Sequence, residues 1–174
     1  MKKLAWPLAA IWLVGAQAAA ADQFAKVQCG GNIPKALIGQ RGANERVVVL
    51  ESRNRKLGLK HLGADIISDD LSSINYLICG AEYVVLDDRK GVIRDAVAFP
   101  PHSKKTPAFS GVCQLNGRDQ PGYYMGVLNA EATGDWLPVV AAWKIDEKNA
   151  KLVKSSDESL RCARRGIYTA DGGL

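Results

Sequence analysis

The side chains best suited to chemistry gather in a proline-bounded segment, residues 100–107, with the sequence Pro-Pro-His-Ser-Lys-Lys-Thr-Pro. Its imidazole, His102, is next to the hydroxyl of Ser103, and Ser110 and Asp95 are close in the sequence. Nucleophilic catalysis needs such a hydroxyl beside a base that a third group orients. The chain has no G-x-S-x-G motif to expose a serine at an oxyanion hole. We therefore predict no catalytic residue and keep an unrecognised periplasmic hydrolase, its site formed by dispersed acidic residues, as the second alternative.

Carboxylates and metal ligands show no functional spacing. Glycoside hydrolysis requires two acidic groups in one cleft, and no pattern pairs the candidates Glu51, Glu82, Asp95 and Glu131. The only histidines are His61 and His102, and there is no C-x-x-C pair to bind zinc. Neither 69–70 nor 87–88, both Asp-Asp, has calcium-loop spacing. The sequence predicts neither a metal nor a cofactor.

The segment 100–107 is better suited to binding. Three prolines limit its backbone freedom, which reduces the entropy lost when a partner orders it. His102, Ser103, Lys104 and Lys105 offer an imidazole, a hydroxyl and two ammonium groups to carboxylates or phosphates. Our first hypothesis is a non-enzymatic periplasmic binding protein, an inhibitor or immunity-type partner of a cell-envelope hydrolase or toxin. An ordinary solvent-exposed connection remains the simpler interpretation of this loop.

A second basic segment gives the first alternative. Arg53, Arg55, Lys56 and Lys60 follow one another closely, and three further arginines, Arg161, Arg164 and Arg165, come near the end of the chain. Runs of charge are usually solvated surfaces. If they act in binding, the protein is an envelope-interaction module for an anionic polymer, peptidoglycan or lipopolysaccharide.

Residues 1–21 have the features of a cleaved signal peptide. Lys2 and Lys3 precede an apolar stretch that ends in an alanine-rich cleavage region. That stretch is too short to favour a membrane span. We expect a periplasmic or secreted protein, not membrane-spanning after cleavage, formed by residues 22–174 as a single domain. Without Lys2 and Lys3, 21 basic residues face 18 acidic ones, a net charge of +3. This excess is too small for a nucleic-acid-binding surface.

Four cysteines lie after the predicted cleavage site. An even number in an exported chain predicts two disulfides. The preferred pairing joins Cys29 to Cys79 and Cys113 to Cys162, although the sequence leaves all three pairings open. Each closed loop of about 50 residues would contribute roughly 4 kcal/mol on the chain-entropy model.

The elements that must position these residues are mostly strands. β-Branched and alternating runs predict strands at 24–29, 44–51, 82–88, 92–99, 123–130, 137–146 and 151–154. A capping pattern at Ser68 favours a helix over 68–79, with a strand over 74–79 as the competing interpretation. A second short helix is expected after Ser155.

The predicted fold is α+β and β-rich, a mostly antiparallel curved sheet or half-closed barrel with one or two short helices. The core is expected to contain Val47, Val49, Val84, Leu86, Ile93, Val97, Phe99, Leu128, Val139, Trp143 and Ile145.

Overall fold

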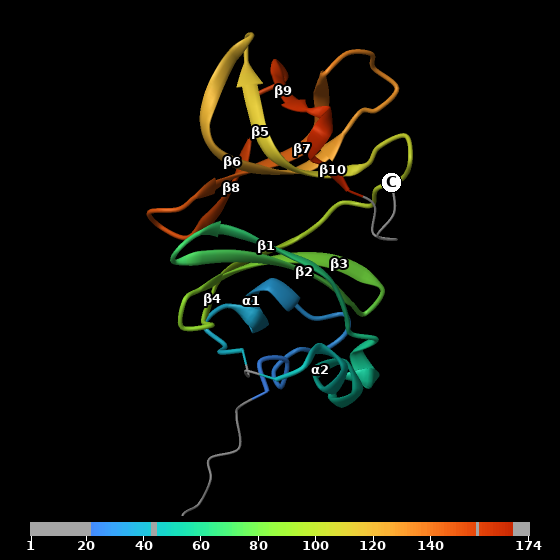
Figure 1. The fold of residues 1–174 in the computed structure, drawn as a ribbon. Helices are drawn as coiled ribbons and strands as arrows, with labels where there is room; N and C mark the ends of the chain where they lie inside the picture. The colour runs from blue at the N-terminus through green and yellow to red at the C-terminus, as the bar shows by residue number, and fades with distance from the viewer. Residues whose placement is uncertain (1–21, 43–44, 156, 169–174) are drawn as a thin grey trace, which may run out of the picture.

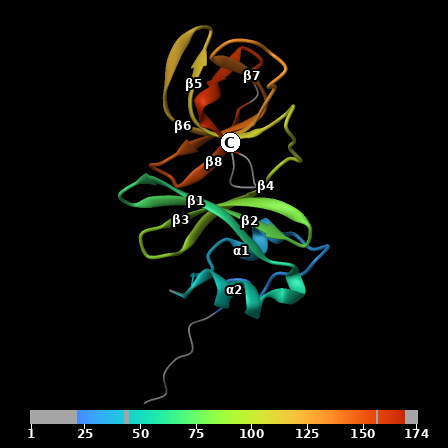
Figure 2. The same ribbon diagram turned by 45° about the vertical axis from the view of Figure 1, so that its right-hand side comes forward.

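Two antiparallel sheets are stacked face to face in the computed structural model (Figure 1), which describes residues 22–42, 45–155 and 157–168. The predicted signal peptide, residues 1–21, lies outside the described residues. The lower sheet is a four-stranded meander of β1 (Lys60–Ser68), β2 (Leu71–Ile78), β3 (Ala81–Asp88) and β4 (Ile93–Ala98). Helices α1 (Ile33–Leu37) and α2 (Val47–Arg53), with the 3₁₀ turn η1 (Arg55–Leu57), lie on its side away from the upper sheet (Figure 2).

The upper sheet curls into a small barrel-like layer. It contains β5 (Ala108–Leu115), β6 (Arg118–Leu128), β7 (Trp136–Asp146), β8 (Lys151–Ser155), β9 (Leu160–Ala163), the 3₁₀ turn η2 (Arg164–Gly166) and β10 (Ile167–Tyr168). Because β9 pairs with both β5 and β7, the strands β5, β6, β7 and β9 form a closed ring.

Gly126 allows two strands of this ring to approach closely. A Cβ atom at this position of β6 would overlap the carbonyl oxygen of Ala141 in β7. Any larger residue would therefore push the strands apart, because interiors packed this densely have no room for extra atoms.

Three hydrophobic clusters hold the described residues together. One lies between the helices and the lower sheet, where Phe24, Leu37 and Ile78 are fully buried. The second joins the two sheets and includes Leu86, Met125, Ile145 and the large ring of Trp143. The third fills the barrel-like ring. The second cluster makes the two layers a continuous packed body, and hydrogen bonds such as Leu152 N to Asp95 Oδ2, 2.8 Å, also cross it.

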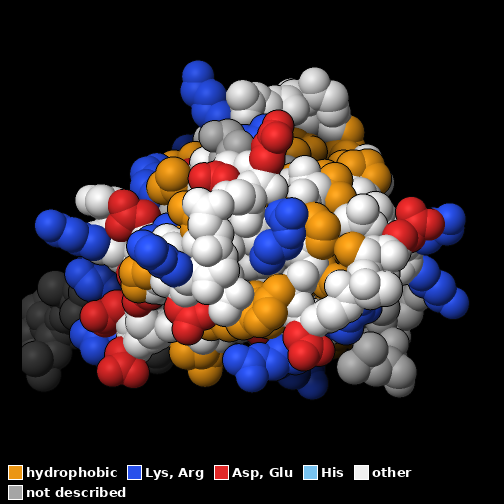
Figure 3. Space-filling view, turned by 90° about the horizontal axis from the view of Figure 1, so that it is seen from above, with side chains coloured by type: hydrophobic (Ala, Val, Ile, Leu, Met, Phe, Trp, Pro, Cys, Tyr) orange, Lys and Arg blue, Asp and Glu red, His pale blue; other side chains and the backbone are white. Residues whose placement is uncertain are grey.

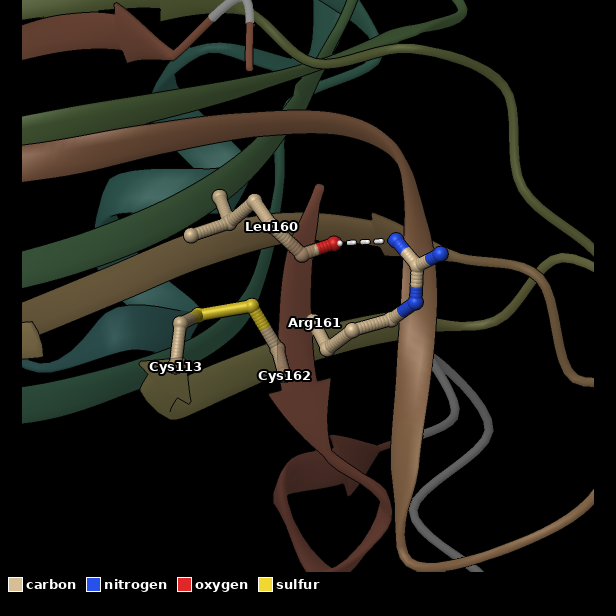
Figure 4. Close-up of a disulfide and its surroundings, with 4 residues drawn as sticks. All are labelled: Cys113, Leu160, Arg161 and Cys162. Atoms are coloured by element: carbon tan, nitrogen blue, oxygen red, sulfur yellow. Dashed lines mark hydrogen bonds between the residues drawn. A yellow bond between two sulfur atoms is a disulfide. The ribbon is translucent and has the colours of Figure 1, made fainter. Parts of the chain in front are cut away.

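Each layer has its own disulfide, and both predicted pairs are confirmed. Cys29–Cys79 ties the N-terminal segment to the turn after β2, and Cys113–Cys162 links β5 to β9 (Figure 4). They are separated by 50 and 49 residues in the sequence. Cys113 and Cys162 are also register partners across the two strands, so the bond reinforces the closure of the ring.

The β-rich fold with few helices and a curved antiparallel sheet is confirmed. The predicted strands at 82–88, 92–99, 123–130, 137–146 and 151–154 are all present, although β6 begins earlier, at Arg118. The turn before β6 is only Asn116-Gly117, both with positive φ (52° and 73°), as the two-residue hairpin geometry requires.

Four local predictions were wrong. Residues 24–29 form turns, with Val27 N donating to Phe24 O, and no strand. Within 68–79, where a helix was expected, Leu71–Ile78 form β2, in agreement with the competing strand interpretation over 74–79. Both faces of this strand carry buried residues, so its apolar residues need not share one side. The helix expected after Ser155 is replaced by β9, since Leu160 and Cys162 enter the interior of the ring.

The largest difference is in the predicted buried strand 44–51, of which the structure describes residues 45–51. From Val47 the chain forms helix α2, in which Leu50 alone is buried. The carboxylate of Glu51 accepts the backbone N–H of His61 at 2.8 Å, which ties the helix to the start of β1. Tertiary contacts have overridden the strand propensity of three valines. Val47 and Val49, predicted core residues, are 42% and 38% exposed.

Candidate binding surfaces

Three adjacent valines of α2 form an exposed apolar surface. Val47, Val48 and Val49 are 42%, 64% and 38% exposed, whereas the next residue, Leu50, is 6% exposed and packs into the core. Successive residues of an α-helix are turned by about 100°. With Leu50 directed inward, the three valines therefore occupy the remaining sides of the first turn.

Folding alone does not account for these valines. The solvent side of a surface helix normally carries polar residues. Valine also loses χ1 freedom in a helix, so it stabilises this helix less than alanine or lysine would. Large exposed apolar groups that are rimmed by polar residues are typical of interaction sites.

Basic side chains follow this apolar turn closely in the chain, at the end of α2, in η1 and at the start of β1. Arg53, at the end of α2, is 2.6 Å from Glu45. Arg55 and Lys56 of η1 and Lys60 of β1 are exposed, and none of them forms an ion pair within the part of the chain that the structure describes. We call the three valines with Arg53, Arg55, Lys56 and Lys60 the α2 surface. It combines hydrocarbon with three uncompensated positive charges.

The other predicted site, the 100–107 loop, uses most of its polar groups internally. His102 Nε2 is 2.8 Å from Glu82 Oε2 in β3, and the two side chains are only 17% and 11% exposed. The imidazole also packs edge-on against Phe99, with ring centroids 6.0 Å apart. The position of His102 is therefore that of a group holding the loop to the lower sheet.

The rest of this loop is fixed in a similar way. The hydroxyls of Ser103 and Thr106 are 3.0 Å apart, and Ser103 N donates to Thr106 O. Lys105 pairs with Glu131 at 2.8 Å, and its carbonyl accepts the N–H of Ala130. Lys104 is exposed and has no ion pair among the described residues. The loop is thus ordered before any partner binds, but few of its polar and charged groups are free to bind one.

The residues considered for nucleophilic catalysis are not brought together. The ring nitrogen of His102 contacts Glu82, Ser103 bonds to Thr106, and Ser110 Oγ donates to Asp65 at 3.1 Å. Asp95 accepts the backbone N–H of Leu152. Asp95 lies in β4 and the Ser110 partner Asp65 in β1, and these strands are the two opposite edges of the lower sheet. Across the described ranges, no three His, Cys, Asp or Glu residues lie close enough to hold a metal ion.

The two predicted basic groups lie in different layers. The arginines near the C-terminus belong to β9 and η2 in the upper layer, whereas α2 and η1 lie below the lower sheet (Figure 1). Arg161 donates to the carbonyl of Leu160 (Figure 4) and also to that of Glu158. Arg164 donates to the carbonyls of Gly134 and Ala132. Seen from above, the upper layer shows positive and negative side chains interspersed (Figure 3). Arg161 and Arg164 thus bind backbone carbonyls of the upper layer, and the group of three arginines does not extend the α2 surface.

A polar network between the sheets was not anticipated. Asn75, 7% exposed in the middle of β2, donates its amide to Glu82 Oε1 at 3.0 Å and to the hydroxyl of Tyr168 at 2.8 Å. Through Glu82 the network reaches His102. Burial raises the pKa of Tyr168 well above its ordinary value, so this hydroxyl remains protonated. The one available signal was an asparagine within the run of apolar residues that ends β2.

Comparisons with protein-family models, curated proteins and solved structures found no match. Among the described residues, no helix is both long and apolar enough to cross a membrane.

Proposed function

We propose that this protein is a non-enzymatic binding protein of the cell envelope that docks on an anionic lipid surface through the α2 surface. The observation that carries the proposal is the turn of three exposed valines, followed closely in the chain by Arg55, Lys56 and Lys60, which form no ion pair among the described residues. Basic and apolar groups on one short helical surface are the combination that interfacial helices use at the boundary of headgroups and acyl chains.

Simple magnitudes support binding of this kind. Complete burial of one valine side chain contributes about 1.5–3 kcal/mol, so covering three partly exposed valines contributes about 3 kcal/mol. A Lys or Arg near an anionic membrane surface adds about 1 kcal/mol. Together these terms favour reversible, peripheral binding that depends on both the charge of the lipid and the salt concentration.

The valines distinguish a lipid from a wholly polar polymer. Peptidoglycan could pair with the cations, but it has no hydrocarbon to cover Val47, Val48 and Val49. A lipid supplies phosphate and acyl chains together, and lipopolysaccharide has both. Of the anionic polymers considered as ligands of Arg53, Arg55, Lys56 and Lys60, the lipid hypothesis therefore retains lipopolysaccharide, which is amphiphilic, and excludes peptidoglycan.

Co-sedimentation with vesicles tests this proposal. The protein should bind to phosphatidylcholine vesicles that contain phosphatidylglycerol. It should bind much more weakly to vesicles of phosphatidylcholine alone. Arg55→Glu with Lys56→Glu should reduce binding at least 100-fold, because two attractions become two repulsions of about 1 kcal/mol each.

The chain offers a matched control for that variant. Lys104→Glu with Lys105→Glu changes the net charge by the same amount on the 100–107 loop, where both lysines are exposed. This control should retain most of the binding. Equal losses in both variants would mean that only net charge matters, and absence of binding to anionic vesicles by the unmodified protein would refute the proposal.

A protein inhibitor acting through the 100–107 loop is the second candidate. Its support is the order of the loop, fixed by the Ser103–Thr106 contacts and by the His102–Glu82 pair. A loop already in its bound shape loses little entropy on binding. Here the Lys104 and Lys105 reversal should abolish capture of a periplasmic hydrolase, while the Arg55 and Lys56 reversal should not. Capture that is unchanged by the loop variant would reject this second candidate.

A further inference from the structure

A hollow of about 360 Å³ lies where the open edge of the lower sheet meets the upper layer. Strands β1 and β2 supply Gly63, Asp65 and Asn75 on one side, and β5, η2 and β10 supply Ser110, Arg165 and Tyr168 on the other. Its size is at the lower end of the range typical of small-molecule sites. It is separate from the α2 surface, with which it shares no residue.

The lining of the hollow is largely polar, and several of its side chains are held by hydrogen bonds. Asn75 uses both of its amide hydrogens, on Glu82 and on Tyr168. The Tyr168 hydroxyl accepts one of them, and it has no hydrogen-bond acceptor among the described residues for its own proton. Ser110 is held similarly, since it donates to Asp65 and lies 3.4 Å from the hydroxyl of Tyr123. The Tyr168 hydroxyl is therefore a positioned donor available to a ligand.

Opposite charges line the hollow from its two sides. Asp65 belongs to the lower layer and Arg165 to the upper layer, and both are exposed. In the described part of the chain neither forms an ion pair, with the other or with any other residue. A carboxylate and a guanidinium that line one hollow without meeting leave room for a ligand that satisfies both.

The position of Arg165 is set by its neighbour. Gly166 packs so closely on β5 that a Cβ atom there would overlap the carbonyl oxygen of Ser110. This contact places η2 directly against the strand that carries Ser110, so Arg165 and Ser110 lie on the same side of the hollow. The two charged groups are thus presented by packed elements of different layers.

We propose that this hollow binds a small zwitterion of the amino-acid type, with its ammonium group at Asp65 and its carboxylate at Arg165. The Tyr168 hydroxyl donates a further hydrogen bond to the carboxylate. The bound ligand bridges the two layers, replacing a missing direct ion pair between them.

NMR titration of the full chain tests the site. Glycine, L-alanine, D-alanine and dialanine are the probes, and acetate and methylamine are controls that each carry half of the zwitterion. At least one zwitterion should shift the backbone resonances of Asn75 and Ser110 in a saturable way. Each half-ligand should bind at least tenfold more weakly, because one of the two charged contacts is lost.

Two conservative variants separate recognition from folding. Asp65→Asn retains an oxygen that can accept the Ser110 hydroxyl, and Arg165→Gln changes an exposed side chain, so both should melt like the unmodified protein. Each should weaken zwitterion binding at least tenfold, whereas Arg55→Glu with Lys56→Glu should leave it unchanged. Absence of any saturable shift in the unmodified protein would overturn the proposal. Zwitterion affinity in the Asp65 and Arg165 variants equal to that of the unmodified protein would overturn it as well.

Discussion

The α2 surface and the 100–107 loop look alike as sequences and differ as surfaces. Both contain closely spaced basic residues, and both are joined directly to a strand of the lower sheet. In the loop, His102 and Lys105 have carboxylate partners at 2.8 Å. On the α2 surface, Arg55, Lys56 and Lys60 have none among the described residues and follow the exposed valines closely in the chain. Of the two, the α2 surface therefore has more charged and apolar groups available to bind another molecule.

Distant partners, and not local composition, decide whether the charged groups of a basic segment are free. Glu82 is 20 residues from His102 in the sequence, and Glu131 is 26 residues from Lys105. No pattern within 100–107 reveals either contact. The α2 segment differs because its nearby carboxylates are occupied, Glu45 by Arg53 and Glu51 by the N–H of His61.

The largest effect on stability is expected from His102→Ala. This change leaves the nearly buried carboxylate of Glu82 with only the amide of Asn75. Loss of a hydrogen bond to a charged group costs about 1.5–3 kcal/mol. For a chain of this size, thermal unfolding should therefore occur roughly 5–10 °C lower.

The lipid assay completes this prediction. Vesicle binding by the folded His102→Ala protein should be unchanged, because the imidazole belongs to the loop. A melting temperature within a degree of that of the unmodified protein would show that the His102–Glu82 contact does not stabilise the fold. The 100–107 loop would then differ less from the α2 surface.

A smaller effect, and on binding alone, is expected from Val47→Ser with Val48→Ser. Two apolar side chains lose their contact with acyl chains, and the two partly exposed valines together contribute about 1.5–2 kcal/mol. Vesicle affinity should fall about tenfold. The melting temperature should hardly change, since surface substitutions usually stay within about 0.5 kcal/mol. Undiminished affinity would mean that charge alone drives the binding.

The smallest effect is expected from Lys105→Ala. Its pair with Glu131 is 77% and 62% exposed, and exposed pairs contribute about 0–1 kcal/mol. Both the melting temperature and vesicle binding should match those of the unmodified protein. Calorimetry and co-sedimentation on the same sample check this, and a loss of several degrees would show that the loop depends on more than His102.

Much of the fold was predictable where one local signal dominated. The hairpin of β3 and β4 follows from two β-branched runs around a short turn, and the predicted core residues Val84, Leu86 and Trp143 are buried. Two disulfides were expected from the even number of cysteines, and the preferred pairing, one of three that the sequence left open, is confirmed. The hairpin depends on residues that are close in the sequence. The number of disulfides depends on the even number of cysteines in a chain predicted to be exported.

The errors arise where long-range packing opposed local propensity. Val47–Val49 have the composition of a strand, yet Leu50 and Asn54 fix the segment as a helix under the sheet. Residues 68–79 resemble a helix only because a strand buried on both faces needs no alternation. The hollow between Asp65 and Arg165 could not be predicted, because its two sides are 100 residues apart and meet only when the layers stack.

Hydrogen exchange in the presence and absence of anionic vesicles tests the central claim most directly. Peptides that cover residues 46–57 and 100–107 can be followed in one experiment on the unmodified protein. Our account predicts slower exchange over 46–57 when vesicles are added, with no change over 100–107. Protection of 100–107 without protection of 46–57 would contradict it.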